Sequence, residues 1–335
     1  MNKKIEEAID FVVTWVDGLD PHWLQEKERY KSNIYMDDSM VRYRDFGTLR
    51  YLLRSIEKFA PWVRTIFLVT NGQVPKWLDF DNPKLKIVKH ADFIPEKYLP
   101  TFNPQTIEWH LHKIQGLSEN FVYFNDDVIL MDYVKPSDFF KNDMPCDTFG
   151  LGIVQPKTVF SRMFFNNICV LNKHFDFRDT LKSNHRKFFN FKYGKILFKT
   201  YILSKRKIFY GMYDPHITLS LKKNYFEILW KKERLLIEES CKNKFRSQSD
   251  ITIWLVRYWQ LLTGHFMPRS NNFGRLYSMD NFIQVKNIKN RLRKKKYKVI
   301  CVNDNSQSDM AFDYKEKYFS NIMNNIFNEK SCFEK

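Results

Sequence analysis

The chain has 335 residues, of which 44% are hydrophobic and 17% aromatic, and its formal net charge is +17. This composition supplies a large core and excludes a disordered chain, while the few glycines and prolines exclude a collagen-like or low-complexity protein. The excess of basic residues indicates contact with a polyanion, such as nucleic acid, an anionic membrane surface or a phosphorylated substrate. Solvated basic faces are the alternative.

The first 150 residues alternate between predicted strands and helices. Short apolar, β-branched runs predict strands at 10–16, 64–70, 85–88 and 121–124. Apolar residues spaced three and four apart predict a helix over 47–60, and Asn103-Pro104 has the residue types of a helix start. This order predicts an α/β fold with a mostly parallel sheet.

The rest of the chain is less regular. Residues 185–207 mix basic with aromatic and aliphatic side chains, which predicts either an amphipathic segment lying on a membrane or a helical insertion packed on the sheet. We expect 216–263 to be helical and 299–302 to be a last strand. The strongly basic run at 286–298 predicts a phosphate- or lipid-facing patch, or an exposed loop.

Cysteine spacing and the N-terminal sequence predict a cytoplasmic protein. The five cysteines are widely spaced and contain no CxxC pair, which argues against a disulfide framework or a zinc site. The first ten residues have no apolar run behind their charges, so we expect no secretory signal. A membrane-spanning helix needs about 18 consecutive apolar residues, and no stretch of the sequence is that long. Any membrane contact is therefore expected to be peripheral.

Polar residues follow three of the predicted strands. Asp17 follows the first, Asn71 the second, and Asn125-Asp126-Asp127 the fourth. Ligands of parallel α/β sheets bind beyond these carboxyl ends. Adjacent carboxylates repel each other unless a cation offsets their charge, and their oxygens suit Mg²⁺ or Mn²⁺. A turn is the alternative, because these residue types also favour turns.

Histidines and arginines elsewhere add weaker candidates. His110 and His112 do not share one helix face, which disfavours a zinc site and leaves either a single ligand contact or a structural role. Arg44 and Asp45 precede a helix N-terminus, where an anion or a surface ion pair fits. His216, expected just before a helix, is either a general base or a structural histidine.

Three long segments carry a resemblance to a known family. They are DFVVTWVDGLDPHW at 10–23, RYRDFGTLRYLLRSIEKFAPWVRTIFLVTNGQVPKWL at 42–78 and LPTFNPQTIEWHLHKIQGLSENFVYFNDDVIL at 99–130. Together they strongly resemble the first two conserved blocks of the Stealth family, and 213–251 and 299–305 resemble its third and fourth. The family includes bacterial capsular and exopolysaccharide phosphotransferases and is related to animal lysosomal-enzyme N-acetylglucosamine-1-phosphotransferase.

The resemblance implies an architecture and a reaction. It implies a Rossmann-like, GT-A-like nucleotide-sugar-binding core over 1–150, a basic amphipathic insertion over 151–210, and a helical segment with a closing strand over 211–335. The implied reaction moves a hexose-1-phosphate or N-acetylhexosamine-1-phosphate from a UDP-sugar to a glycan hydroxyl and releases UMP. Implied partners are Mg²⁺ or Mn²⁺ and a lipid-linked capsule or exopolysaccharide repeat unit at the inner, anionic face of the cell membrane. The short segment before the first block leads us to expect a single transfer.

Family roles carry over to matching positions. The implied catalytic residues are His216, Arg246 and Asp127. The implied donor-binding residues are Thr14, Trp15, Asp17, Gly18, Arg44, Asp45 and Asn71. The implied metal ligands are Asp126, Asp127 and Asp304. Further donor or acceptor contacts are expected from His110, His112 and Asn303.

Two other functions compete with this one. A UDP-sugar glycosyltransferase would break the sugar C1–O bond and release UDP instead of UMP. A nucleic-acid-binding protein is permitted by the charge, but the chain contains no recognised binding motif, so we expect no nucleic-acid partner.

Overall fold

The computed structural model describes residues 8–31, 36–37, 43, 46–279, 292, 296–303 and 309–335. Three residues with expected roles, Arg44, Asp45 and Asp304, lie outside the described residues, as does most of the basic run 286–298.

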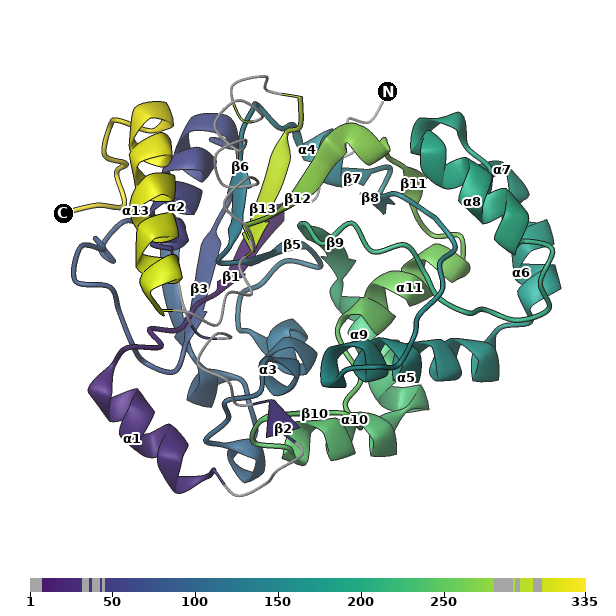
Figure 1. The fold of residues 1–335 in the computed structure, drawn as a ribbon, viewed down its shortest axis with the longest axis horizontal. Helices are drawn as coiled ribbons and strands as arrows, with labels where there is room; N and C mark the ends of the chain where they lie inside the picture. The colour runs from purple at the N-terminus through teal and green to yellow at the C-terminus, as the bar shows by residue number, and fades with distance from the viewer. Residues whose placement is uncertain are drawn as a thin grey trace.

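A five-stranded sheet forms the centre of the molecule (Figure 1). Its strands lie in the order β4 (Leu85–Lys89), β3 (Ile66–Thr70), β1 (Ile9–Thr14), β5 (Asn120–Asn125) and β9 (Leu219–Lys222). The first four strands are parallel, and β9 pairs antiparallel with β5. Three of the runs predicted as strands are thus the buried centre of the sheet and β4 is its edge, which confirms the α/β class and the mostly parallel sheet.

The two faces of this sheet pack into separate hydrophobic cores. Val12 of β1 joins the core that contains α3 (Pro104–His110) and α11 (Trp254–Leu262). Phe11 and Val13 join the core that contains α2 (Thr48–Phe59) and α13 (Asp309–Ile326). Successive side chains of a strand point to opposite faces, so β1 contributes to both cores.

A second sheet lies beside the carboxyl end of β5. Strand β13 (Val299–Asn303) pairs in parallel with β12 (Gly274–Ser278) and antiparallel with β6 (Val128–Leu130). The expected last strand at 299–302 is therefore confirmed. Because β6 directly follows Asp127, this pairing brings β13 to the Asp126-Asp127 turn.

The remaining elements complete the two cores and the surface. The other helices are α1 (Pro21–Arg29), α4 (Pro136–Phe139), α5 (Val159–His174), α6 (Phe177–Ser183), α7 (His185–Phe188), α8 (Lys195–Leu203), α9 (Lys223–Lys232) and α10 (Arg234–Lys242). Short 3₁₀ turns cover His90–Asp92, Glu96–Tyr98, Leu111–Lys113, Phe191–Tyr193 and Asn271–Phe273. The other strands are β2 (Met36–Asp37), β7 (Phe140–Lys141), β8 (Met144–Asp147), β10 (Arg246–Ser247) and β11 (Met267–Pro268).

The expectation of a helical segment throughout 216–263 is wrong at its beginning. All four residues of β9 are buried against the edge of β5, so His216 precedes a strand and not a helix. Leu219 and Leu221 alternate with polar residues, and this period-two pattern is satisfied by pairing with the sheet. The expected division of the chain at residues 150 and 210 stays a prediction.

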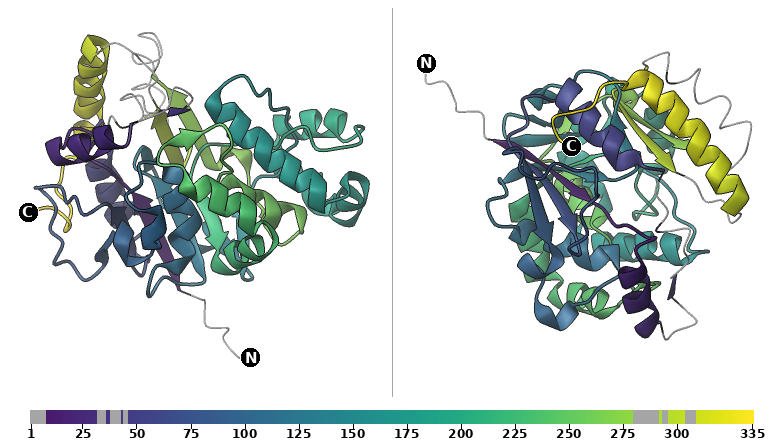
Figure 2. Two further views of the ribbon diagram at one scale, coloured as in Figure 1. Left: turned by 90° about the horizontal axis from the view of Figure 1, so that it is seen from below. Right: turned by 90° about the vertical axis from the view of Figure 1, so that its left-hand side faces the viewer.

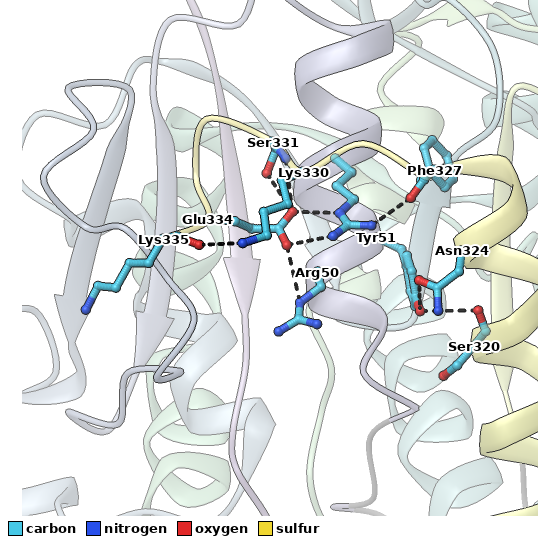
Figure 3. Close-up of polar contacts among 10 residues, drawn as sticks. Arg50, Tyr51, Ser320, Asn324, Phe327, Lys330, Ser331, Glu334 and Lys335 are labelled. Atoms are coloured by element: carbon cyan, nitrogen blue, oxygen red, sulfur yellow. Dashed lines mark hydrogen bonds and ion pairs between the residues drawn. The ribbon is translucent and has the colours of Figure 1, made fainter.

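The C-terminal segment is fastened to α2 by a buried carboxylate (Figure 3). Glu334 accepts hydrogen bonds of 2.6 and 2.8 Å from Arg54, and Arg54 also donates to the backbone oxygen of Phe327. Tyr51 donates to the side chain of Asn324 at 3.0 Å. These contacts hold α13 alongside α2, as Figure 1 and the right-hand view of Figure 2 show. None of the helices that the structure describes combines the length and the apolar composition needed to cross a bilayer.

Candidate active site

The site is built at the carboxyl edge of the parallel strands. Thr14, the last residue of β1, is in register with Asn125 of β5 and with Val69 of β3. The segments that follow these strands therefore leave the sheet side by side, which brings Trp15, Asn71 and Asp126 to one edge. The backbone N–H of Trp15 donates to Val69 O at 3.0 Å, and Asn71 is exposed.

Gln73 ties together the loops after β1 and β3. Its side chain accepts from the backbone N–H of Asp17 and donates to the backbone oxygen of Asp17, both at 3.0 Å. It also donates to Asp20, and this hydrogen bond is the main reason that the pKa of Asp20 lies below its usual value. An open pocket next to these hydrogen bonds of Gln73 is lined by residues that include Asp20, Trp23, Asn71 and Gln73.

Gly18 is required by the close approach of another segment. A Cβ atom at this position would overlap the backbone oxygen of Tyr43, so only glycine fits. Packing alone therefore explains why position 18 is a glycine, whether or not Gly18 contacts the donor as expected.

Asp127, His216 and Cys301 form the centre of the site. Each offers one donor atom, and these atoms lie within 4.8 Å of one another. The Cys301 thiol donates to Asp127 Oδ2 at 3.1 Å, and the backbone N–H of Val302 donates to Asp127 O at 2.9 Å. Burial raises the pKa of Cys301 well above its usual value, and the Asp127 charge adds to this effect, so the thiol keeps its proton. Three separate segments thus meet at the Asp127 carboxylate.

A strained loop presents the His216 imidazole. His216 has φ of 46°, in the left-handed region that residues other than glycine seldom adopt. Its backbone N–H donates to Asp214 Oδ1 at 2.7 Å, and its ring lies nearly parallel to that of Trp254, at 13° with 6.4 Å between centroids. Burial raises the pKa of Asp214, while His216 and Arg257 act in the opposite direction.

Hydrogen bonds from Arg257 hold the segment that leads into this loop. The buried guanidinium donates to both carboxylate oxygens of Asp147, at 2.6 and 3.0 Å, and to the backbone oxygens of Tyr213 and Thr148, at 2.9 Å each. It also lies 5.2 Å from the ring centroid of Trp254. Arg257 therefore fixes both the chain that leads into His216 and the ring beside His216.

A separate series of side-chain interactions runs from Thr14 through Tyr123 and Glu108 towards Arg246. Thr14 Oγ1 lies 2.9 Å from the Tyr123 hydroxyl, which donates to Glu108 Oε1 at 3.0 Å. Burial raises the pKa of Glu108 to about 7, with the Tyr123 hydrogen bond and the Arg246 charge acting in the opposite direction. Among the described residues, Arg246 Nη1 is buried and has no hydrogen-bond partner. This leaves a guanidinium N–H for the oxygen of a ligand.

Asp126 acts electrostatically both on the hydrogen-bonded series from Thr14 to Glu108 and on the group formed by Asp127, His216 and Cys301. Its charge raises the pKa of Tyr123 in the Thr14 series and also that of Cys301 in the Asp127 group, although burial is the main cause in both. Of the expected site residues, Asp127 and His216 therefore lie together, and Thr14 and Arg246 are linked to each other through Tyr123 and Glu108. Asn303 ends β13 two residues beyond Cys301 and is half-buried.

The donor chemistry here fits a divalent cation. The Asp126 and Asp127 carboxylates supply the oxygens that Mg²⁺ or Mn²⁺ prefers. The His216 imidazole and the Cys301 thiol are donors that softer divalent cations accept more readily than Mg²⁺ does. Asp304, the other expected ligand, lies outside the described residues.

His110 and His112 lie in the core and not with Asp127. His110 packs against Tyr98 and Trp230, and His112 stacks on Phe226 with 5.2 Å between ring centroids. Burial lowers the pKa of His110 to about 4 and that of His112 to about 3, so both are neutral. These contacts support the structural alternative, and their expected ligand contacts stay a prediction.

Several residues of the site escaped the sequence analysis. Glu108 carries no local signal beyond its place on α3, and this helix ends at His110, before His112. Cys301 was considered only in terms of cysteine spacing. Nothing local in the sequence marks Arg257 or Trp254, whose roles depend on tertiary contacts.

Comparison with known proteins identifies the class and the family. Conserved region 2 of the Stealth proteins matches residues 42–147, and conserved region 1 matches residues 7–35. The capsular polysaccharide phosphotransferase WcwK of Streptococcus pneumoniae is 43% identical, with 98% of each chain covered. The exopolysaccharide phosphotransferase cps2G of Lactiplantibacillus plantarum is 39% identical, covering 98% of this chain and 96% of the relative. The protein is therefore an α/β transferase by class, and the chain belongs to the Stealth family.

A more distant likeness links the chain to a solved structure. The galactosyltransferase LgtC, in complex with donor and acceptor sugar analogs, aligns over 94% of this chain and 95% of its own. The sequence identity is 10% and the TM-score is 0.38, which is too low to support an argument about function.

Proposed function

We propose that this protein transfers a hexose-1-phosphate or N-acetylhexosamine-1-phosphate from a UDP-sugar to a glycan hydroxyl, releasing UMP and forming a phosphodiester. The observation that carries the proposal is the convergence of Asp127 and His216 at the carboxyl edge of the sheet. Arg246 adds a cation whose charge acts on the buried Glu108. The relatives named capsular and exopolysaccharide phosphotransferases support the same class of reaction.

In this reaction the phosphorus attached to the sugar is the electrophile, so the protein mainly positions the reactants and neutralises charge. His216 accepts the proton of the acceptor hydroxyl as that oxygen attacks phosphorus. Arg246 donates its available N–H to a phosphoryl oxygen, and UMP leaves on the opposite side. The donor is held by the residues at the strand ends, Thr14, Trp15, Asp17, Gly18 and Asn71, and by Arg44 and Asp45.

The metal, the acceptor and the location are part of the same proposal. Asp126, Asp127 and Asp304 would hold Mg²⁺ or Mn²⁺, which when bound offsets the negative charge of the diphosphate. Asn303 keeps its expected place among the donor or acceptor contacts. The acceptor is a capsule or exopolysaccharide repeat unit linked to a lipid, and the protein works in the cytoplasm at the inner face of the bacterial cell membrane.

The identity of the nucleotide product tests this proposal. The protein is incubated with a panel of UDP-sugars and with lipid-linked or water-soluble oligosaccharide acceptors, and the products are read by chromatography and ³¹P NMR. We expect UMP and a sugar–phosphate–sugar diester. Release of UDP with a phosphorus-free glycan would contradict the proposal and establish the glycosyltransferase alternative.

Replacement of His216 tests the assignment of the base. His216→Ala should lower turnover by about 10²- to 10⁴-fold, the usual contribution of general-base catalysis, with little change in donor affinity. The exposed His185→Ala is the matched control and should leave turnover unchanged. Wild-type turnover in His216→Ala would remove His216 from the mechanism.

A further inference from the structure

We propose that the outward face of α8 docks this protein on an anionic lipid bilayer. The α8 face is defined as Phe191, Lys195, Phe198, Lys199, Tyr201 and Ile202. The inference deepens the proposed function, because it names the surface that brings the protein to a lipid-linked acceptor. The docking is argued only from the exposed side chains and the charge of α8 and its flanking residues, and not from the proposed reaction.

Helix α8 is apolar on two opposite sides. On the inner side Thr200 Oγ1 accepts from the backbone N–H of Leu151 at 3.1 Å, and Leu203 is buried. On the outer side Phe198, Tyr201 and Ile202 are 72%, 56% and 49% exposed. At about 100° per residue these three side chains span one continuous stripe opposite the buried side.

A helix on the surface of a water-soluble domain normally turns polar residues outward, so this stripe needs a partner. The exposed apolar surface also continues beyond the helix. Phe191, just before α8, is 93% exposed, and Ile208 and Tyr210, just after it, are 48% and 46% exposed. Figure 1 places α6, α7 and α8 together at one edge of the molecule, on the side away from α13.

The charge around the stripe identifies the partner. Residues 180–213 contain nine lysines and arginines and no aspartate or glutamate. Lys195 and Lys199 are exposed along one side of the stripe. A cationic rim around exposed aromatic and aliphatic side chains is complementary to anionic headgroups above an acyl layer. A second copy of this chain would instead bring two strongly basic faces together, and these repel each other.

Helix α8 packs next to the segment that leads to His216. A Cβ atom at Gly150 would lie 2.4 Å from Ile196 Cγ2 of α8 and 2.8 Å from Tyr213 Cβ, so both side chains crowd the Gly150 backbone. The backbone N–H of Tyr213 donates to Gly150 O at 2.7 Å. Helix α8 and the residues just before His216 therefore pack against the same residue. A bilayer docked on the α8 face is thus separated from this segment by little more than α8 itself.

Vesicle flotation tests the docking without any donor or acceptor. The probes are phosphatidylglycerol-rich vesicles and pure phosphatidylcholine vesicles. We expect the wild-type protein to float with the anionic vesicles only, and to dissociate as salt is raised. Equal partition to both kinds of vesicle, or to neither, would overturn the proposal.

Two sets of variants locate the surface. Phe198→Ser/Tyr201→Ser/Ile202→Ser and Lys195→Gln/Lys199→Gln should each lower partition at least tenfold. The matched controls lie on other exposed surfaces, Leu235→Ser for the apolar set and Lys231→Gln/Lys232→Gln for the basic set, and should float like the wild type. Wild-type flotation by either α8 variant would overturn the assignment, as would a halved molecular mass of the apolar variant by light scattering.

The same variants separate the two proposals. With a water-soluble acceptor, the apolar variant should release UMP at the wild-type rate, because no residue of the α8 face belongs to the site. Loss of flotation with intact UMP release supports docking by α8. Wild-type flotation without UMP release from any UDP-sugar leaves the docking standing and overturns the reaction instead.

Discussion

At the scale of single residues, Asp127 tests the metal assignment directly. Asp127→Asn keeps a hydrogen-bond acceptor for the Cys301 thiol but removes the charge that a divalent cation needs. Loss of a metal ligand weakens transition-state stabilisation by several kcal/mol, on the order of 10³-fold in turnover. Steady-state rates at saturating Mg²⁺ measure this loss, and the exposed Asp81→Asn serves as control. Near-wild-type turnover would contradict the assignment.

Glu108 gives a prediction about stability and pH. Its pKa is raised by burial from 4.5 to about 7, so the folded protein holds a proton that the unfolded chain has lost. The stabilisation of the folded state by this group is complete below pH 4.5 and disappears as pH rises to 7. Glu108→Gln, which keeps the acceptor for Tyr123, should therefore gain stability relative to wild type by roughly 2–3 kcal/mol across this window.

Urea unfolding from pH 4.5 to 7.5 measures this difference. Asp250 has a pKa raised by burial to about 6 and contributes to the pH dependence of both proteins, so only the difference between them reports Glu108. A constant difference across the window would show that folding does not raise the pKa of Glu108.

At the scale of elements, Arg257 of α11 links packing to the placement of His216. Arg257→Lys keeps the charge but loses the planar fork that holds Asp147 and Tyr213 O together. Leaving a buried carboxylate poorly paired should destabilise the fold by about 3 kcal/mol. Because Tyr213 leads into the strained His216 loop, turnover should fall while donor affinity is kept. The exposed Arg162→Lys is the control, and an unchanged turnover would mean that the loop is held by other contacts.

Predictability from sequence also differs between elements. The parallel strands β1, β3, β4 and β5 were predicted within a few residues. Strands β1, β3 and β5 are buried on both faces and are therefore continuous apolar runs, whereas β4 is a half-exposed edge strand that was recognised from its aliphatic residues. Strand β9 was missed, since four residues between a loop and a helix carry too short a pattern. The strand-end residues Asn71 and Asp127 were predicted from the topology of parallel sheets. Cys301 and Glu108 were not, because their neighbours come from distant segments of the chain.

At the scale of the whole molecule, Glu334 joins the C-terminal segment to the helix that covers the central sheet. Its side chain is 4% exposed and lies against Arg54 at 2.6 Å and Arg50 at 3.5 Å. Burial acts to raise the pKa of Glu334, but the hydrogen bond from Arg54 and those from Ser331 outweigh it, so the pKa is lowered. The stabilisation is therefore present at neutral pH and is lost as pH falls through the lowered pKa.

Glu334→Gln should lower the free energy of unfolding by about 3 kcal/mol at neutral pH, because it leaves the Arg54 guanidinium without its charged partner in a nearly closed environment. The difference from wild type should shrink in acid, where the native carboxyl is also neutral. Thermal unfolding followed by circular dichroism at pH 7 and in acid measures both effects. Glu329→Gln, at an exposed position of the same segment, should unfold like the wild type. Turnover per folded molecule should be unchanged, since α2 and the C-terminal segment contribute no side chain to the Asp127 group. A stability loss that stays constant in acid would show that Glu334 acts through packing and not through its charge.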